Sequence, residues 1–172
     1  MNNKPTTPAV KGLIISAILV VYSIVIISLK MDTNKDLGPI PYAIVFGGTL
    51  FGSLYFAREM NGNVSFMEVF KHGFKMTTLV AAIAGFWILI SMKYLFPHVL
   101  EHGMELIKTN MVKQGKTHEE ADKFIAGYRN GALAMSSIMT VVLYIIIGAL
   151  GAVTGAVFST KNPEYIPGEQ AK

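Results

Sequence analysis

The hydrophobic residues of the chain gather in four long runs that contain no charged side chain. These runs comprise residues 12–29, 37–57, 76–92 and 131–158. At about 1.5 Å per residue, helices of these lengths would be roughly 25 to 42 Å long, and the hydrocarbon core of a bilayer is about 30 Å thick. The pattern therefore predicts four membrane-spanning helices. The third is expected to extend to residue 96, because the long alkyl chain of Lys93 lets its ammonium group reach the headgroups.

The runs are apolar on every side and do not alternate, which excludes the strands of a membrane β-barrel. In lipid the backbone groups of such a run must pair within the segment, and a helix achieves this. We therefore expect an all-α membrane protein, a four-transmembrane-helix bundle that forms a single domain over residues 12–158. Residues 1–11 are expected to be a flexible N-terminal tail and residues 159–172 a disordered C-terminal tail, since both contain prolines and polar residues.

The connection between the third and fourth spans, residues 97–130, predicts an amphipathic helical hairpin. Pro97 breaks the helix that leaves the membrane, and apolar residues then recur at helical spacing, namely Leu100, Met104, Ile107 and Met111. Thr117 and Glu120 form a capping box that opens a second helix, which is expected to continue into the last span. Each arm is too short to bury a core of its own, so the hairpin must rest on the membrane or on the bundle.

A short polar stretch leads into the third span. Ser65 and Glu68 have the spacing of a capping box, so the third helix is expected to begin at Ser65. Lys71, His72 and Lys75 follow on the first turns of that helix. We expect His72 to contact lipid headgroups, with recognition of anionic lipid as the functional alternative.

Composition supports a membrane location and removes several classes of function. Hydrophobic residues make up 52% of the chain and charged residues only 15%, against about 25% charged in an average soluble domain. The chain has no cysteine, which excludes a disulfide scaffold, thiol catalysis and cysteine-based metal sites. The formal net charge is +4, but the basic residues are scattered between apolar runs. We therefore expect them to face anionic lipid headgroups and not nucleic acid.

The order and spacing of these segments resembles the small four-span bacterial membrane proteins of domain-of-unknown-function family 4199. The resemblance covers residues 11–161 and rests on the Gly47–Gly48 pair of the second span, the approach to the third span, the charged hairpin with Gly115 and the glycine-spaced last span. The family has no assigned activity. The resemblance therefore implies topology and a bacterial cytoplasmic (inner) membrane location, and it implies no catalytic residue or cofactor.

Four spans place both chain termini on the same side of the membrane. Lys and Arg residues are nearly equal in number on the two sides, so the overall count does not decide the orientation. The first helix usually dominates, and the tail before it holds Lys4 and Lys11 and no acidic residue. We therefore expect cytoplasmic termini.

One cluster has the spacing of a metal site. His98, Glu101 and His102 match the H-x-x-E-H pattern of inverted zinc peptidases. On a helix both histidines share a face with Glu105, so these three could ligate zinc, with Glu101 as the base. The motif directly follows Pro97 at a membrane exit, and no recognisable third-ligand segment comes after it. We interpret the cluster as part of the solvent-exposed face of an amphipathic helix and expect no metal or cofactor. A membrane-surface metal enzyme is a remote alternative.

Glycines recur at short helical spacings in the second and fourth spans. Glycine lets helix backbones approach closely in lipid, where no hydrophobic force draws the helices together. We expect these glycines to be sites of helix packing inside the bundle, and a homodimer seam is the alternative. The positions are Gly48, Gly52, Gly148, Gly151 and Gly155.

None of the four runs contains Asp, Glu, Lys, Arg or His, the residues that mark ion and proton paths inside membranes. A proton-coupled exporter is therefore not expected. We predict a non-enzymatic membrane protein that acts through helix packing, as a self-assembling or accessory subunit. Its partners would be the lipid bilayer and a second copy or another membrane protein. The alternative is a small oligomeric transporter or pore.

Overall fold

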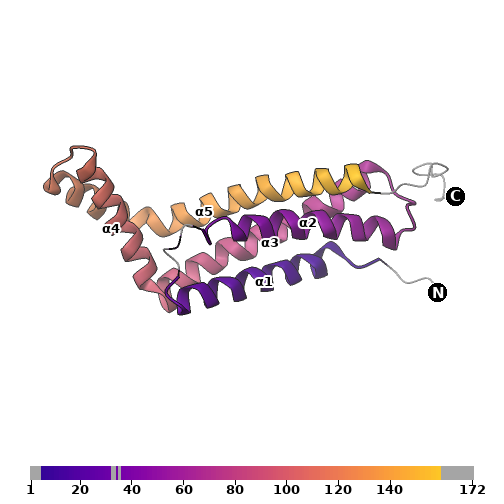
Figure 1. Ribbon diagram of the computed structural model, residues 1–172, viewed down its shortest axis with the longest axis horizontal. Coiled ribbons are helices and arrows are strands. Elements are labelled where there is room, and N and C mark those ends of the chain that lie inside the picture. The colour runs from indigo at the N-terminus through magenta and orange to yellow at the C-terminus, as the bar shows by residue number, and fades with distance from the viewer. Residues whose placement is uncertain (1–4, 32–33, 35, 160–172) are drawn as a thin grey trace. The chain divides into compact units, whose positions relative to one another are not determined.

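The computed structural model describes residues 5–31, 34 and 36–159, and these residues contain helices and no strand (Figure 1). The helices follow in the order α1 (Pro8–Ser28), α2 (Ile40–Glu59), α3 (Phe66–Ile90), the π-helix η1 (Ser91–Leu95), α4 (Pro97–Lys113) and α5 (His118–Phe158). The chain divides into two compact units, one of residues 1–83 with 142–172 and one of residues 84–141. Helices α3 and α5 each contribute to both units.

Among the described residues, four helical segments are long and apolar enough to cross a membrane, which confirms the all-α, four-span fold. The segments are Pro8–Ser28, Ile40–Glu59, Phe66–Leu95 and Gly131–Phe158. Their outward faces carry large apolar side chains, and Leu13, Val21, Phe51, Leu150 and Val157 are all exposed. Lipid tails are as apolar as these side chains, so the exposed surface is suited to a bilayer.

The start of α1 corrects the predicted N-terminal tail, because residues 8–11 are helical. Thr7 is the N-cap, and its hydroxyl accepts a hydrogen bond from the Val10 amide at 3.4 Å. Pro8 occupies the first helical position, where a missing N–H costs nothing. The predicted disordered C-terminal tail lies outside the described residues except for Ser159, whose hydroxyl donates to the Ala156 carbonyl at 2.9 Å.

Helix α3 begins at Phe66, and the capping box before it is formed as the spacing predicts. The Ser65 amide and hydroxyl both donate to the Glu68 carboxylate, at 2.7 and 2.9 Å. The Glu68 amide donates in return to the Ser65 hydroxyl at 3.2 Å. The helix then runs without a break into the membrane-spanning segment.

The first unit is a four-helix bundle in which α2 contacts each of the other three helices (Figure 1). Ile15 of α1 packs next to Gly48, and Met76 of α3 packs next to Gly52. Gly151 of α5 lies against the backbone carbonyl of Phe46. The side chains in the middle of this bundle, among them Val45, Val69, Met76 and Val80, are fully buried.

The second unit contains the end of α3, η1, α4 and the first part of α5. Within it, Ser137 of α5 donates to the Gly85 carbonyl of α3 at 2.9 Å. The π-helix η1 ends at the Phe96 amide, which donates to the Ser91 carbonyl at 2.6 Å. Pro97 then starts α4, so the expected break falls at this proline.

Helix α4 and the start of α5 form the predicted hairpin, and Met104 of α4 is buried. Gly115 in the turn has φ +91°, a conformation that glycine adopts without strain. The Thr117 amide donates to the Glu120 carboxylate at 2.9 Å and the Glu120 amide to the Thr117 hydroxyl at 3.2 Å, which confirms the second capping box. From His118 onward α5 is one helix that includes the last span.

Candidate functional site: a polar cluster at one end of the bundle

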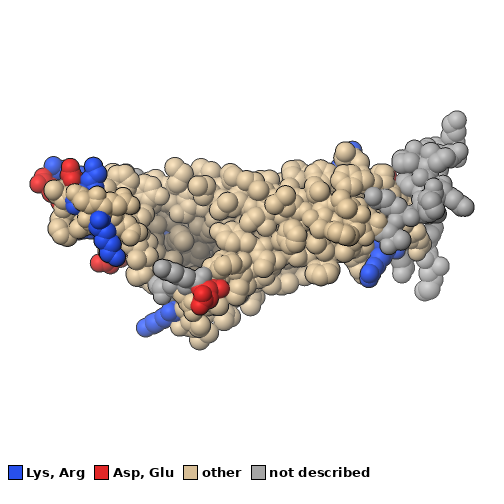
Figure 2. All heavy atoms as spheres, turned by 45° about the horizontal axis from the view of Figure 1, so that its top comes forward, with Lys and Arg blue, Asp and Glu red and all other residues tan. Residues whose placement is uncertain are grey.

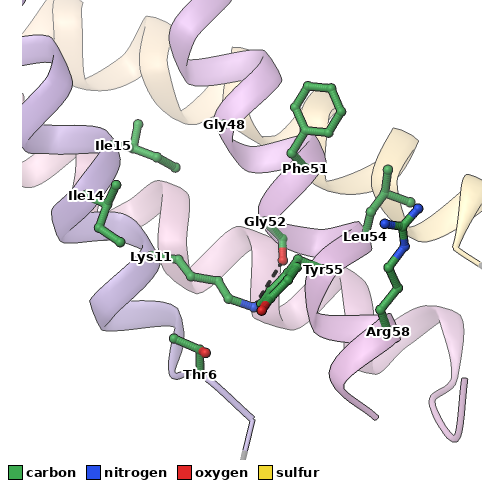
Figure 3. Close-up of a pocket in the computed structure, with 10 residues that line it drawn as sticks. All are labelled: Thr6, Lys11, Ile14, Ile15, Gly48, Phe51, Gly52, Leu54, Tyr55 and Arg58. Atoms are coloured by element: carbon green, nitrogen blue, oxygen red, sulfur yellow. Dashed lines mark hydrogen bonds between the residues drawn. The ribbon is translucent and has the colours of Figure 1, made fainter. Parts of the chain in front are cut away.

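Lys11 is buried within the bundle although it is charged. Its side chain is on the second turn of α1 and reaches across to α2, where the ammonium nitrogen lies 3.4 Å from the Gly52 carbonyl oxygen (Figure 3). The same nitrogen lies 4.9 Å from the centre of the Tyr55 ring. Because Gly52 has no side chain, the alkyl part of Lys11 can pass over α2 at this point. Only 8% of the residue is exposed.

Glu59, the last residue of α2, neutralises Lys11. Its oxygen Oε2 accepts a hydrogen bond from the Lys11 ammonium at 2.8 Å. The other oxygen, Oε1, accepts from the Thr6 amide at 3.1 Å and also from the Thr6 hydroxyl. Both oxygens of the carboxylate are therefore occupied, and the segment before α1 is attached to the end of α2.

His72 of α3 is also buried, with 6% of the residue exposed. Its ring stacks on Phe56, with centroids 4.0 Å apart and planes 13° from parallel. The expected contact with lipid headgroups is therefore wrong. The physical reason is that α3 is one helix from Phe66, so the face that carries His72 is the face that carries Val69 and Met76 into the bundle.

Two buried polar atoms in this region have no hydrogen-bond partner among the described residues. They are Nε2 of His72 and Oγ of Ser53. Ser53 is on α2, one helical turn from Ala57, and is fully buried. Further into the bundle, the hydroxyls of Thr49 and Thr77 lie 3.3 Å apart. The bundle thus holds a set of buried polar groups from α2 and α3.

The five glycines named from the sequence all lie against other helices of the first unit. A Cβ atom at Gly148 would be 2.3 Å from Thr77, and one at Gly155 would be 2.9 Å from the Leu50 carbonyl oxygen. Gly48, Gly52 and Gly151 are enclosed in the same way by Ile15, Met76 and Phe46. Gly73 of α3, which the sequence analysis did not single out, is as tightly enclosed, since a Cβ there would be 2.7 Å from Ala152.

The metal candidates on α4 are not drawn together into a site. His98, Glu101, His102 and Glu105 are all exposed. Glu101 accepts a hydrogen bond from Arg129 of α5 at 3.0 Å, and His98 packs edge-on against Phe96. Among the described residues, no three His, Asp or Glu side chains approach one another closely enough to hold a metal ion. The Glu101 carboxylate thus connects α4 to α5 within the hairpin.

Charged side chains elsewhere lie near the helix ends and on the hairpin. On the face seen in Figure 2, the surface between these places carries no charged atom. Such a distribution is typical of a protein whose helices cross a bilayer. Fold and site together define a small α-helical, multi-pass membrane protein with a buried polar cluster at one end of its bundle.

The chain belongs to the family described as "Protein of unknown function (DUF4199)", whose model matches residues 11–161. This match confirms the resemblance stated from the sequence. Neither a curated protein nor a solved structure matches the chain.

The apolar pattern does not predict the polar cluster, because Lys11 stands just outside the first uncharged run. A usable signal was present, since Thr7 followed by Pro8 is a helix start. A helix that begins at Pro8 carries Lys11 in its first turns, beside the membrane-spanning residues. No pattern in the sequence, however, indicates that Glu59 and His72 lie at the same place.

Proposed function

We propose that the chain is a non-enzymatic subunit of a bacterial cytoplasmic membrane, which acts through the outward faces of its helices on a second copy or on another membrane protein. The observation that supports this most is the structural role of the Lys11–Glu59 ion pair. Lys11 and Glu59 neutralise each other and tie α1 to α2, as a structural pair does. The five glycines predicted to pack helices are enclosed by helices of the same chain, so contacts with a partner fall on the apolar outward faces.

The chain has no cysteine, so single cysteines can test this proposal in native membranes. Val153→Cys places a thiol on the exposed face of α5, and Ala152→Cys is the matched control, because Ala152 is fully buried one position earlier. We expect cross-linking from one or more outward positions, including Val21→Cys and Phe51→Cys, and none from the control. A lack of cross-linking from every outward face of all four helices would contradict the proposal.

The orientation is part of the same proposal, with both termini in the cytoplasm. Asn34 lies in the connection between α1 and α2, Gln114 follows α4, and Met67 is in the first turn of α3. We expect a membrane-impermeant maleimide added outside to label Asn34→Cys and Gln114→Cys and to leave Met67→Cys unlabelled. The reverse labelling pattern would contradict cytoplasmic termini.

A second candidate, a small oligomeric transporter or pore, is favoured by one observation. The buried Nε2 of His72 and Oγ of Ser53 have no hydrogen-bond partner among the described residues. Polar groups inside a membrane bundle are costly, and where they occur they commonly have a function. Flux of protons or small cations into proteoliposomes tests this candidate. Transport that falls in His72→Phe and in Ser53→Ala, but not in the surface variant Lys71→Gln, would favour it over the first proposal.

A further inference from the structure

An open groove runs between α1 and α2 on the outer surface of the bundle (Figure 3). Its volume is about 570 Å³. Ile14 and Ile15 line it from α1, and Gly48 and Phe51 line it from α2. Gly52, which has no side chain, also lines the groove. Its walls are apolar and it opens outward, so in a bilayer its surroundings are acyl chains.

The groove has the length of one leaflet. Along α2 it extends from Arg58, next to the end of the helix, to Gly48 near the middle of the span. At about 1.5 Å per residue this distance is roughly 15 Å. The hydrocarbon core of a bilayer is about 30 Å thick, so the groove covers about half of it. An acyl chain from the leaflet on the side of the chain termini fits this extent.

The polar end of the groove is positively charged. Arg58 is exposed, and its guanidinium group forms no ion pair or hydrogen bond with another described residue. Lys11 also lines the groove, and its charge is cancelled by Glu59. Within the part of the chain that the structure describes, the guanidinium charge of Arg58 therefore remains without a partner at this end of the groove. Its planar set of N–H donors matches two oxygens of a phosphate.

We propose that this groove is a binding site for one anionic phospholipid, with an acyl chain against Ile14, Ile15 and Phe51 and the phosphate on Arg58. Anionic lipid is favoured over zwitterionic lipid, because an ammonium group on the headgroup would be repelled by Arg58. The site does not depend on which subunit or transport function the chain has.

Native mass spectrometry of the full chain, released from mixed phosphatidylcholine and phosphatidylglycerol membranes, tests this site. We expect the wild type to retain one phosphatidylglycerol per chain in preference to phosphatidylcholine. Arg58→Gln should weaken this retention about tenfold, as expected for the loss of one charge-assisted contact. Ile14→Trp, which fills the groove, should reduce retention of either lipid.

Two matched variants separate this site from general membrane attraction. Lys71→Gln removes an exposed charge from α3 at the same end of the bundle, and Ile18→Trp adds the same bulk one turn along α1, where the side chain is exposed and outside the groove. Both should retain lipid as the wild type does. Arg58, Ile14, Lys71 and Ile18 are all on the surface, so none of these variants should unfold the bundle.

Four outcomes would overturn the proposal. One is equal loss of lipid in Lys71→Gln and Arg58→Gln, which indicates diffuse attraction. Another is equal retention of the two lipids by the wild type. The third is displacement of the lipid by excess inorganic phosphate, which indicates a free-anion site. The last is retention of a second copy of the chain in place of lipid, lost in Ile14→Trp.

Discussion

The ammonium nitrogen of Lys11 lies 2.8 Å from the carboxylate oxygen Oε2 of Glu59, although the two residues are 48 positions apart in the chain. The pair joins the start of α1 to the end of α2, and the two side chains are only 9% and 16% exposed. An unpaired charge in such surroundings is costly, so each partner needs the other. The pair therefore favours the one arrangement in which these two helix ends lie side by side.

Breaking this pair should destabilise the bundle. In Lys11→Met, Glu59 is left as a partly buried charge with only Thr6 as a donor, and we expect the free energy of unfolding in detergent micelles to fall by about 3 kcal/mol. The double variant Lys11→Met/Glu59→Met should recover most of this loss, because no unpaired charge remains. Lys71→Met, at an exposed position, should stay within about 0.5 kcal/mol of the wild type. A double variant as unstable as the single one would show that the two residues act separately.

Even the smallest side chain at Gly151 should be unfavourable. A Cβ atom there would be 2.6 Å from the Phe46 carbonyl oxygen, so the two backbones must move apart. We expect Gly151→Ala to lower the melting temperature in detergent, with a cost of about 1 to 3 kcal/mol. Gly47→Ala is the control, because no atom lies within 4 Å of a Cβ at Gly47. Since alanine is the better helix former, that variant should be neutral or slightly stabilising, and equal effects at the two positions would contradict close packing at Gly151.

The buried His72 ring should act through its shape and not through its nitrogen atoms. His72→Phe keeps a flat ring next to Phe56 and removes the unpartnered Nε2, so we expect stability equal to or above that of the wild type. His72→Ala leaves a cavity and should cost about 2 kcal/mol or more. Unfolding in detergent, followed by circular dichroism, distinguishes the two variants. Strong destabilisation by His72→Phe would mean that the imidazole has a polar partner.

The start of α5 should loosen in acid. The hydrogen bond from the Thr117 amide, that from the Thr117 hydroxyl and the charge of Lys116 lower the pKa of Glu120 below its ordinary value of 4.5. The folded state binds a proton at Glu120 less tightly than the unfolded state does. The stabilisation that the Glu120 carboxylate gives to the start of α5 is therefore complete above pH 4.5. It is lost as the pH falls below that value and passes through the lower pKa of the folded state.

Amide hydrogen exchange at residues 118–121 measures this effect. We expect exchange there to accelerate as the pH decreases below 4.5, after correction for the intrinsic rate. Glu120→Gln should have faster corrected exchange at neutral pH and no such acceleration, since it lacks the titrating carboxylate. The equivalent amides at the start of α3, next to Ser65, provide an internal reference. An acid response that persists in Glu120→Gln would assign the effect to another group.

The elements of the fold could be predicted from the sequence, because each depends on local properties. The four apolar runs are close to or above the length that crosses the hydrocarbon core, and lipid leaves a helix as the way to pair their backbone groups. The pairs Ser65–Glu68 and Thr117–Glu120 marked helix starts, since a capping box closes within one turn. Pro97 and Gly115 marked the break and the turn of the hairpin for equally local reasons.

Only the tertiary structure decided which side of each helix faces inward. A segment that is apolar on all sides has no polar face to show its orientation, so hydropathy could not place His72 inside the bundle or Arg58 on its rim. The partners Lys11 and Glu59 come from different helices, and their meeting depends on how α1 packs against α2. The sequence by itself determined the four spans and the hairpin. Helix packing alone determined the polar cluster and the groove beside it, because contacts between distant residues are a property of the whole bundle and not of any one segment.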